Sequence, residues 1–335
     1  MKAIGIVSSL EVDHPEAFVE FDTETPTPGD HDVLVKVAAV SFNPLDIKMR
    51  QRSAIDVTLS KPKILGWDGV GEVTKVGSAA DQRWLGQKVM FTGDITRQGA
   101  NAEYIAVDGR GIANSPISWS TSDAATLALA GVTVFEAIHD QLELGRPASP
   151  TRLLVIGGAG GVGSLAIQLA KLIPECKVIA TASRDESKAW CQALGADHVI
   201  NHYSLEDEYL KLEIEPPTHI LNCASTDAYW SVMANLIAPR GRICSVVENY
   251  EPVDLKMLMR KSATFCWEHM NTSQLLQEAP RSSAIALESV ANLADHEQIR
   301  TTRTTTLNGL TIDNIRRAHQ ILESGRSIGK VVLEL

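Results

Sequence analysis

The chain lacks any uninterrupted hydrophobic stretch of the roughly 20 residues that a membrane-spanning helix needs. It also lacks the features of a signal peptide. The strand-like start at residues 1–7 is followed by an acidic stretch between Glu11 and Glu20, without a hydrophobic centre or a cleavage site of small residues. We therefore expect a cytoplasmic protein that does not cross a membrane.

Cysteine is scarce and unevenly placed. None occurs in the first 175 residues, and the five that follow are widely spaced along the chain. An odd number at such spacing is typical of reduced thiols and argues against a disulfide framework. The five residues are Cys176, Cys191, Cys223, Cys244 and Cys266.

Basic residues are in deficit, because 31 lysines and arginines stand against 41 aspartates and glutamates, which gives a net charge of −10. A nucleic acid or an anionic membrane surface needs a basic face on its protein partner. We therefore expect neither as a partner, although a local basic pocket for one phosphate group remains compatible with this charge.

The length of 335 residues favours two domains, since a single core seldom grows that large. The first third is rich in short alternating runs that predict strands of a small barrel, at residues 33–37, 70–76, 88–91 and 103–107. From about Ser122 the pattern changes. Asp123 can cap a helix at residues 124–129, and residues 134–142 predict another.

Strands then alternate with helices, which predicts a parallel sheet covered on both faces. Expected strands lie at residues 153–156, 178–182, 199–200, 219–221 and 242–247, with helices at 162–173 and 186–194. The end of the chain predicts a helix at 312–323, stopped at Gly325, and a strand at 330–335. The fold class is therefore α/β.

A glycine-rich segment joins the first of these strands to its helix. Gly158, Gly160 and Gly163 have the spacing of the dinucleotide fingerprint, in which side-chain-free backbone approaches a diphosphate and the helix N-terminus faces its charge. A tight turn without a ligand is the alternative. The predicted contacts are Gly158, Ala159, Gly160, Gly161, Val162 and Gly163.

The next predicted strand ends in Ser183 and Arg184, where an NAD-specific site places an acidic residue on the ribose. A serine hydroxyl and an arginine can instead hold a 2′-phosphate, so we predict NADPH as the cofactor. Lys188 and His202 could contribute at the same end, or could be ordinary surface residues. Val246 and Lys330 complete the predicted cofactor site.

Six motifs in order resemble the medium-chain dehydrogenase/reductase superfamily, and within it the quinone oxidoreductases and the zinc-type alcohol dehydrogenase-like proteins. The motifs lie at residues 28–29, 41–46, 65–73, 157–163, 194–200 and 329–333. The resemblance implies a GroES-like β-rich catalytic domain formed by residues 1–123 and 268–335, and an inserted Rossmann domain, a doubly wound parallel sheet, at residues 124–267. It also implies a substrate cleft between them and a homodimer formed by extending the Rossmann sheet, although a tetramer remains open.

The positions that hold zinc in the zinc-dependent branch of this superfamily carry other residues here. Asn43 and Trp67 stand in place of a cysteine and a histidine, and Asp68 replaces a glutamate. The second cysteine is missing near Ala128, and residues 92–103 contain none of the cysteines of the structural zinc site. One carboxylate with an amide and an indole is a poor ligand set for zinc, so we expect no metal.

Without a metal, the consistent chemistry is hydride transfer from NADPH to a quinone or to the β-carbon of an α,β-unsaturated carbonyl. The resemblance places six residues in the cleft: Asn43, Asp46, Trp67, Asp68, Phe91 and Thr133. Asn43 or the Trp67 indole could donate to the substrate oxygen, whereas Asp46 could simply cap a helix, and Trp67 and Phe91 could simply pack. A zinc-dependent alcohol dehydrogenase and a non-catalytic NADPH-binding protein remain the alternatives.

Overall fold

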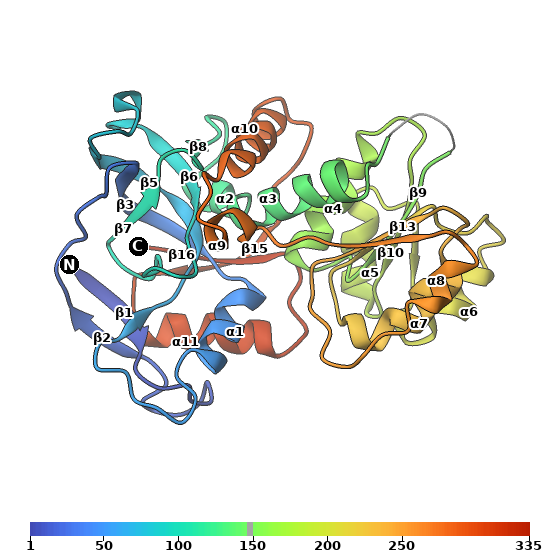
Figure 1. Cartoon of the computed structure of the whole chain (residues 1–335), viewed down its shortest axis with the longest axis horizontal. Helices are drawn as coiled ribbons and strands as arrows, with labels where there is room; N and C mark the ends of the chain where they lie inside the picture. The colour runs from blue at the N-terminus through green and yellow to red at the C-terminus, as the bar shows by residue number, and fades with distance from the viewer. Residues whose placement is uncertain (146–149) are drawn as a thin grey trace. The chain divides into compact units, whose positions relative to one another are not determined.

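The computed structural model describes residues 1–145 and 150–335, which form two compact units (Figure 1). The first unit comprises Met1–Val132 and Met270–Leu335, and the second comprises Thr133–His269. Both chain termini therefore belong to the first unit. The sequence predicts domain boundaries after residues 123 and 267, whereas the units change after residues 132 and 269.

The first unit is built on β-sheets, of which the larger has seven strands within the described residues. Its strands are β3 (Asp32–Ser41), β5 (Asp68–Val76), β6 (Lys88–Thr92), β7 (Tyr104–Asp108), β8 (Ala113–Asn114), β15 (Arg303–Asn308) and β16 (Lys330–Glu334). A smaller antiparallel sheet contains β1 (Lys2–Ile6), β2 (Val19–Asp22) and β4 (Lys63–Ile64). Because β16 pairs with β3, the two ends of the chain share one sheet.

Two glycines in β5 show why this strand carries a glycine-rich motif. A Cβ atom on Gly71 would lie 2.2 Å from the carbonyl oxygen of Lys36, and one on Gly69 would lie 2.5 Å from that of Ala39. Both contacts are with the backbone of β3, which cannot swing aside. The motif at residues 65–73 therefore serves the close packing of β5 on β3, and so fixes the position of Asp68 at the start of β5.

The second unit contains a six-stranded parallel sheet in the order β11-β10-β9-β12-β13-β14. Its strands are β9 (Arg152–Ile156), β10 (Lys177–Thr181), β11 (His198–Ile200), β12 (His219–Asn222), β13 (Arg242–Ser245) and β14 (Thr264–Trp267). The order reverses between β9 and β12, as in dinucleotide-binding doubly wound folds. The expected Rossmann sheet is confirmed.

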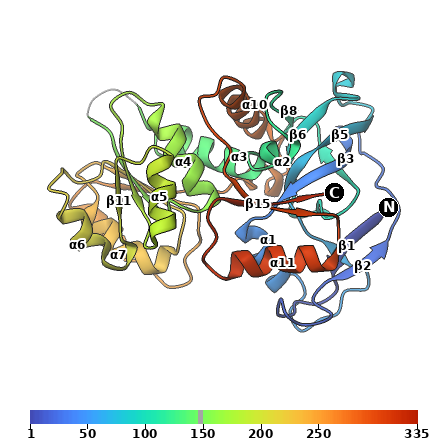
Figure 2. The same cartoon turned by 180° about the vertical axis from the view of Figure 1, so that it is seen from behind.

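Helices cover both faces of this sheet. One face packs against α6 (Leu205–Leu210), α7 (Thr226–Leu236) and α8 (Lys256–Met259), with Ile156, Ile220 and Ile243 in the shared core. The other face packs against α4 (Gly161–Lys171) and α5 (Asp185–Ala193). Both helices are labelled in Figure 2, which shows the molecule from behind. The helices predicted at residues 162–173 and 186–194 correspond to α4 and α5, whereas α6, α7 and α8 have no counterpart among the predicted helices.

The helices before the parallel sheet differ from the prediction. α2 (Thr121–Ala125) begins earlier than expected and is capped by the Ser120 hydroxyl, so the prediction that Asp123 caps a helix at 124–129 was wrong. α3 (Ala128–Glu136) follows and continues into a π-helical turn, η2 (Ala137–Gln141). Asp123 instead forms an ion pair with Arg303, whose Nε lies 2.8 Å from its Oδ1.

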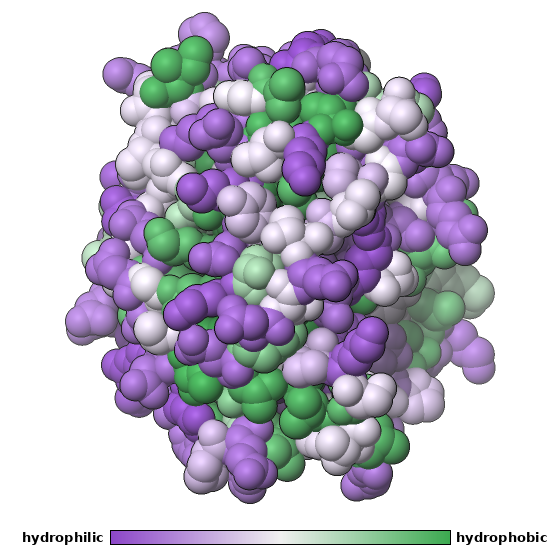
Figure 3. All heavy atoms as spheres, turned by 90° about the vertical axis from the view of Figure 1, so that its left-hand side faces the viewer, coloured by the Kyte–Doolittle hydropathy of each residue, from purple (hydrophilic) through white to green (hydrophobic). Residues whose placement is uncertain are grey.

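The remaining helices of the first unit are α1 (Pro44–Arg52), α9 (Thr272–Leu275), α10 (Arg281–Asp295) and α11 (Ile312–Glu323). The last has the bounds that the sequence predicted. On the face drawn in Figure 3, hydrophilic side chains surround small groups of hydrophobic ones. No helix within residues 1–145 and 150–335 is long and apolar enough to cross a membrane.

Candidate functional site

The glycine-rich turn lies at the carboxyl end of β9, and its glycines have different surroundings. The fold leaves no room for a side chain at Gly163, because a Cβ atom there would lie 2.3 Å from the Gly157 carbonyl oxygen. Gly160 precedes α4 as its N-cap, and its added Cβ would meet only that same oxygen, at an ordinary 3.5 Å. The space beside Gly160 is therefore open, next to the unpaired N–H groups that begin any helix.

The end of β10 carries the residues predicted to select the cofactor. Ser183 is half-buried two residues after the end of the strand, and Arg184 is the N-cap residue of α5. The Ser187 hydroxyl donates to the Arg184 carbonyl at 2.8 Å and accepts from its N–H at 3.2 Å, which fixes the backbone at this position. No acidic side chain stands at Ser183 or Arg184.

Lys188 and His202 lie in the same unit but differ in surroundings. Lys188 is half-buried, one turn into α5. His202 belongs to a short 3₁₀ helix, and its ring is tilted against Tyr203 with centroids 4.2 Å apart. Burial lowers the pKa of His202, which favours a neutral ring near pH 7. The His202 ring would therefore offer a bound cofactor a flat, neutral surface rather than a positive charge.

Sequence reasoning missed a hydroxyl network that fixes the end of β13. Asn222 Nδ2 donates to the hydroxyls of Thr226 and Ser245, at 3.1 and 3.0 Å, and Ser245 Oγ donates to the Val247 carbonyl at 3.1 Å. These groups come from β12, α7 and β13, and they hold the backbone around Val246. The sequence did contain a signal for this network, because Asn222 and Ser245 are polar residues at the ends of two neighbouring parallel strands. Ligands of such sheets bind at the edge formed by the carboxyl ends of the strands.

A buried polar cluster forms in the first unit from residues at both ends of the chain. The Lys330 ammonium donates to the Asn43 amide oxygen and, at 3.1 Å, to the Phe42 carbonyl, and it lies 3.8 Å from Asp68. Ser41 Oγ and the Leu129 N–H donate to Asp68 Oδ2 at 2.6 and 3.3 Å. Lys330, which we predict as a cofactor contact, therefore lies beside Asp68 in the first unit. Burial lowers the pKa of Lys330, and the Asp68 and Asp46 carboxylates oppose this.

Asp46 completes this cluster and caps α1. Its Oδ2 accepts from the Asn43 N–H at 2.7 Å, so the helix-capping alternative is observed, while its Oδ1 is buried and the nearby Gly66 backbone N–H also faces the carboxylate. Burial raises the pKa of Asp46 to about 7, the Asp68 carboxylate adds to this, and the Asn43 hydrogen bond opposes it. Asp46 can therefore hold or release a proton near neutral pH.

The remaining predicted catalytic residues are placed as follows. Trp67 and Phe91 are fully buried and belong to the hydrophobic core of the first unit. The Trp67 indole N–H has no hydrogen-bond partner within residues 1–145 and 150–335. Asn43 also donates to the Ser41 carbonyl at 3.2 Å. Thr133, in α3, is buried and is the first residue of the second unit.

These residues do not fit a catalytic zinc. Asp68, the one carboxylate at the predicted metal positions, already accepts hydrogen bonds and has an ammonium beside it. Asn43 offers an amide oxygen that the same ammonium occupies. A dication would have to displace Lys330 and would still lack sulfur or imidazole ligands. Among the described residues, no group of three His, Cys, Asp or Glu side chains is arranged to hold a metal.

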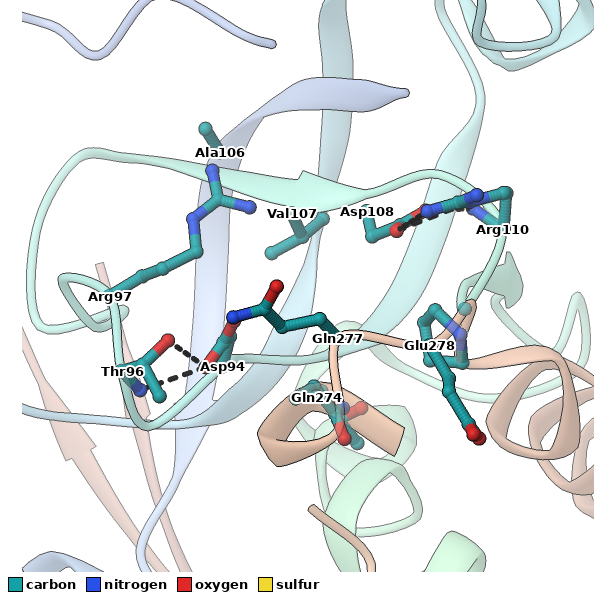
Figure 4. Close-up of a pocket in the computed structure, with 13 residues that line it drawn as sticks. Asp94, Thr96, Arg97, Ala106, Val107, Asp108, Arg110, Gln274, Gln277 and Glu278 are labelled. Atoms are coloured by element: carbon teal, nitrogen blue, oxygen red, sulfur yellow. Dashed lines mark hydrogen bonds and ion pairs between the residues drawn. The ribbon is translucent and has the colours of Figure 1, made fainter. Parts of the chain in front are cut away.

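A separate pocket of about 260 Å³ lies in the first unit (Figure 4). Its two arginines are already neutralised: Arg97 forms two hydrogen bonds with Asp32, and Arg110 pairs with Asp108. In Figure 4 the Gln277 side chain points between Asp94 and Val107. None of the predicted catalytic residues lines this pocket, so we do not identify it with the catalytic site.

Comparison with known proteins matches both parts of the chain to family models. Residues 29–117 match the alcohol dehydrogenase GroES-like domain, and residues 161–283 match the zinc-binding dehydrogenase family. A zinc-type alcohol dehydrogenase-like protein of Staphylococcus epidermidis is 35% identical, and the alignment covers 100% of both chains. The expected resemblance is therefore confirmed.

Solved structures give the same result. A protein from Rhizobium etli CFN 42, assigned as a zinc-dependent alcohol dehydrogenase, is 35% identical with a TM-score of 0.94, covering 100% of this chain and 98% of the other. The quinone oxidoreductase from Coxiella burnetii is 27% identical with a TM-score of 0.81, covering 100% and 99%. The GroES-like and Rossmann fold assignments are both supported by these matches.

Proposed function

Because this chain belongs to the medium-chain dehydrogenase/reductase superfamily of oxidoreductases, we propose that it is an NADPH-dependent reductase of quinones or α,β-unsaturated carbonyl compounds that uses no catalytic metal. The observation that carries this proposal is the Lys330 ammonium among the residues at the zinc positions. A dication could bind at these residues only by displacing this ammonium, and it would still lack sulfur or imidazole ligands. The similarity to the Coxiella burnetii quinone oxidoreductase supports the substrate class.

The residues of the second unit fit a dinucleotide. The open space beside Gly160 would admit the diphosphate, and the amides at the start of α4 would bind its charge. Ser183 and Arg184 would hold the 2′-phosphate of NADPH, since a bidentate guanidinium suits a phosphate and would suit a bare ribose less. When bound, the nicotinamide supplies the hydride for the reaction.

Residues of the first unit would stabilise the charge that develops on the substrate oxygen. The Trp67 indole N–H is an unused donor, and the Asn43 amide keeps one N–H beyond its bond to Ser41. Lys330 would position Asn43 by holding its oxygen. Asp46, with a pKa raised mainly by burial to about 7, is the group we propose to store the proton.

We also propose that the protein is a homodimer. β14 is the last strand of the parallel sheet and has β13 as its neighbour on one side. The other edge of β14 therefore presents backbone groups that a second copy of the strand could pair with. Sedimentation measurements would distinguish this dimer from a monomer or a tetramer.

The cofactor assignment is tested by replacing Arg184. Arg184→Ala should weaken NADPH binding by about 1.5 to 3 kcal/mol, the range for a hydrogen bond to a charged group, and leave NADH binding nearly unchanged. Fluorescence titration with both cofactors measures this. Lys188→Ala is the matched control from the same helix, and it should cost less. Equal losses for NADPH and NADH in Arg184→Ala would refute the assignment.

The reaction is tested by following NADPH oxidation with a panel of quinones and 2-alkenals. Turnover with at least one class is expected. Tight NADPH binding without oxidation across the panel would instead identify a non-catalytic NADPH-binding protein, because the cofactor site would then be separated from any chemistry.

A further inference from the structure

Two of the five cysteines are direct partners on neighbouring strands of the second unit. Cys244 in β13 and Cys266 in β14 stand opposite each other in a parallel ladder. Neighbouring strands lie about 4.8 Å apart, and paired residues project their side chains to the same face. That separation falls inside the roughly 4.4 to 6.8 Å range of Cα distances found across disulfides. The backbone already has a spacing that a disulfide requires.

The two thiols also approach one another. Cys266 Sγ lies 3.3 Å from the carbonyl oxygen of Ile243, the residue directly before Cys244, so it reaches across to the backbone of β13. The side chains of Cys244 and Cys266 interact with each other. This interaction, with burial, raises the pKa of Cys244, while the same interaction and the nearby Arg242 lower the pKa of Cys266. Cys266 is therefore the better nucleophile of the two.

Access and pKa together separate this pair from the other cysteines, because Cys223 is half-buried as Cys266 is. Cys266 is half-buried, on the edge strand, whereas Cys244 is fully buried behind it. Burial raises the pKa of Cys176 to about 11 and that of Cys191 and Cys223 to about 12, which leaves them as unreactive thiols. One accessible thiol beside one enclosed thiol is the arrangement of an attacking and a resolving cysteine.

We propose that Cys244 and Cys266 form a reversible disulfide when the protein meets a hydroperoxide. The Cys266 sulfur attacks the peroxide, forming an S–O bond as the O–O bond breaks, and the leaving hydroxide takes up the Cys266 thiol proton to become water. Cys244 then attacks the resulting sulfenic acid, forming the S–S bond and releasing the second oxygen as water together with the Cys244 proton. Overall, two thiols and one hydrogen peroxide give one disulfide and two waters.

The proposal is independent of the proposed catalysis, because it concerns thiols outside the predicted site. It is also compatible with the proposed dimer, because a second strand would pair with the backbone edge of β14, whereas the Cys266 side chain projects from a face of the sheet. The bond would tie the edge strand β14 to β13 just before Val246. A disulfide between directly paired residues would pull the two sulfur atoms closer than the strand spacing places them, which strains the bond. We therefore expect dithiothreitol to reduce it readily.

Treatment of the full chain with hydrogen peroxide tests the proposal. The wild type should lose two of its five free thiols and the mass of two hydrogen atoms, and dithiothreitol should restore both. Trypsin cuts after Lys256, Arg260 and Lys261, so the link should appear as two joined peptides. Cys223→Ser should behave as the wild type does.

Two variants separate the roles of the pair. Cys266→Ser, at a half-buried position that should not disturb folding, should show no thiol loss under the same treatment. Cys244→Ala should leave Cys266 as a sulfenic acid that dimedone traps. A wild-type chain that gains oxygen without forming the link, or that joins Cys223 to either partner, would overturn the proposal, as would first oxidation at Cys176 or Cys191.

Discussion

Replacing the two glycines of the turn one at a time should separate folding from cofactor binding. In Gly163→Ala the new methyl group would lie 2.3 Å from the Gly157 carbonyl oxygen and 2.8 Å from Gly158 Cα. Both are backbone atoms, so α4 must move away from β9. Crowding of this kind costs about 1 to 3 kcal/mol of unfolding free energy.

Gly160→Ala differs because its methyl group meets no atom closer than 3.5 Å. The backbone angles of Gly160, φ −73° and ψ 174°, are available to alanine. Replacing a glycine N-cap by alanine costs less than about 1 kcal/mol of unfolding free energy. Alanine also makes the unfolded chain less flexible, which offsets part of this cost. The unfolding free energy should hardly change, while the methyl group occupies the space that a diphosphate needs.

The expected result is a crossed pattern. Gly160→Ala should keep the wild-type urea midpoint and lose NADPH and NADH affinity alike, by at least about tenfold, or 1.4 kcal/mol. Gly163→Ala should have a lower midpoint. Fluorescence titration with both cofactors, on protein shown to be folded, measures the first effect. Wild-type affinity in Gly160→Ala, or wild-type stability in Gly163→Ala, would refute this account of the turn.

Two further predictions concern stability. His319 is fully buried near the rings of Phe18 and Phe42, and burial, aided by Arg50, lowers its pKa to about 3. The unfolded chain takes up this proton near pH 6.5, so stability is complete above that pH and falls below it, by about 2 kcal/mol at pH 5. Urea unfolding at pH 7 and 5 should show this loss, and His319→Phe should reduce it. Lys330→Met should cost about 3 to 5 kcal/mol, because Asp68 would remain buried without a cation; a loss below about 1 kcal/mol would contradict the role of Lys330.

The sequence predicted elements whose signals are local. α11 has its predicted bounds because its periodic apolar residues are framed by the Thr311 cap and by Gly325, which has a positive φ of 64°. The glycine turn was predictable for the same reason, since spacing along the chain reports its geometry. The Ser120 cap was missed because Ser120 and Asp123 are both good capping residues, and a tertiary partner, Arg303, takes the Asp123 carboxylate.

The candidate site was only partly predictable, because its geometry comes from distant parts of the chain. Lys330 meets Asn43 and Asp68 only because β16 pairs with β3. The sequence alone does not show that the Lys330 ammonium donates to Asn43 and Phe42. Cys244 and Cys266 are similarly separated by a helix in the chain, and only the register of β13 and β14 makes them neighbours.

The central claim, reduction by NADPH without a catalytic metal, is tested most directly by measuring NADPH-dependent quinone or enone reduction before and after prolonged dialysis against a chelator. We expect the rate to be unchanged and elemental analysis to find well under one zinc per chain, since Asp68 is held by Ser41 and Lys330 and the neighbouring positions carry Asn43 and Trp67. Loss of activity on chelation, with recovery on adding zinc, would contradict the claim.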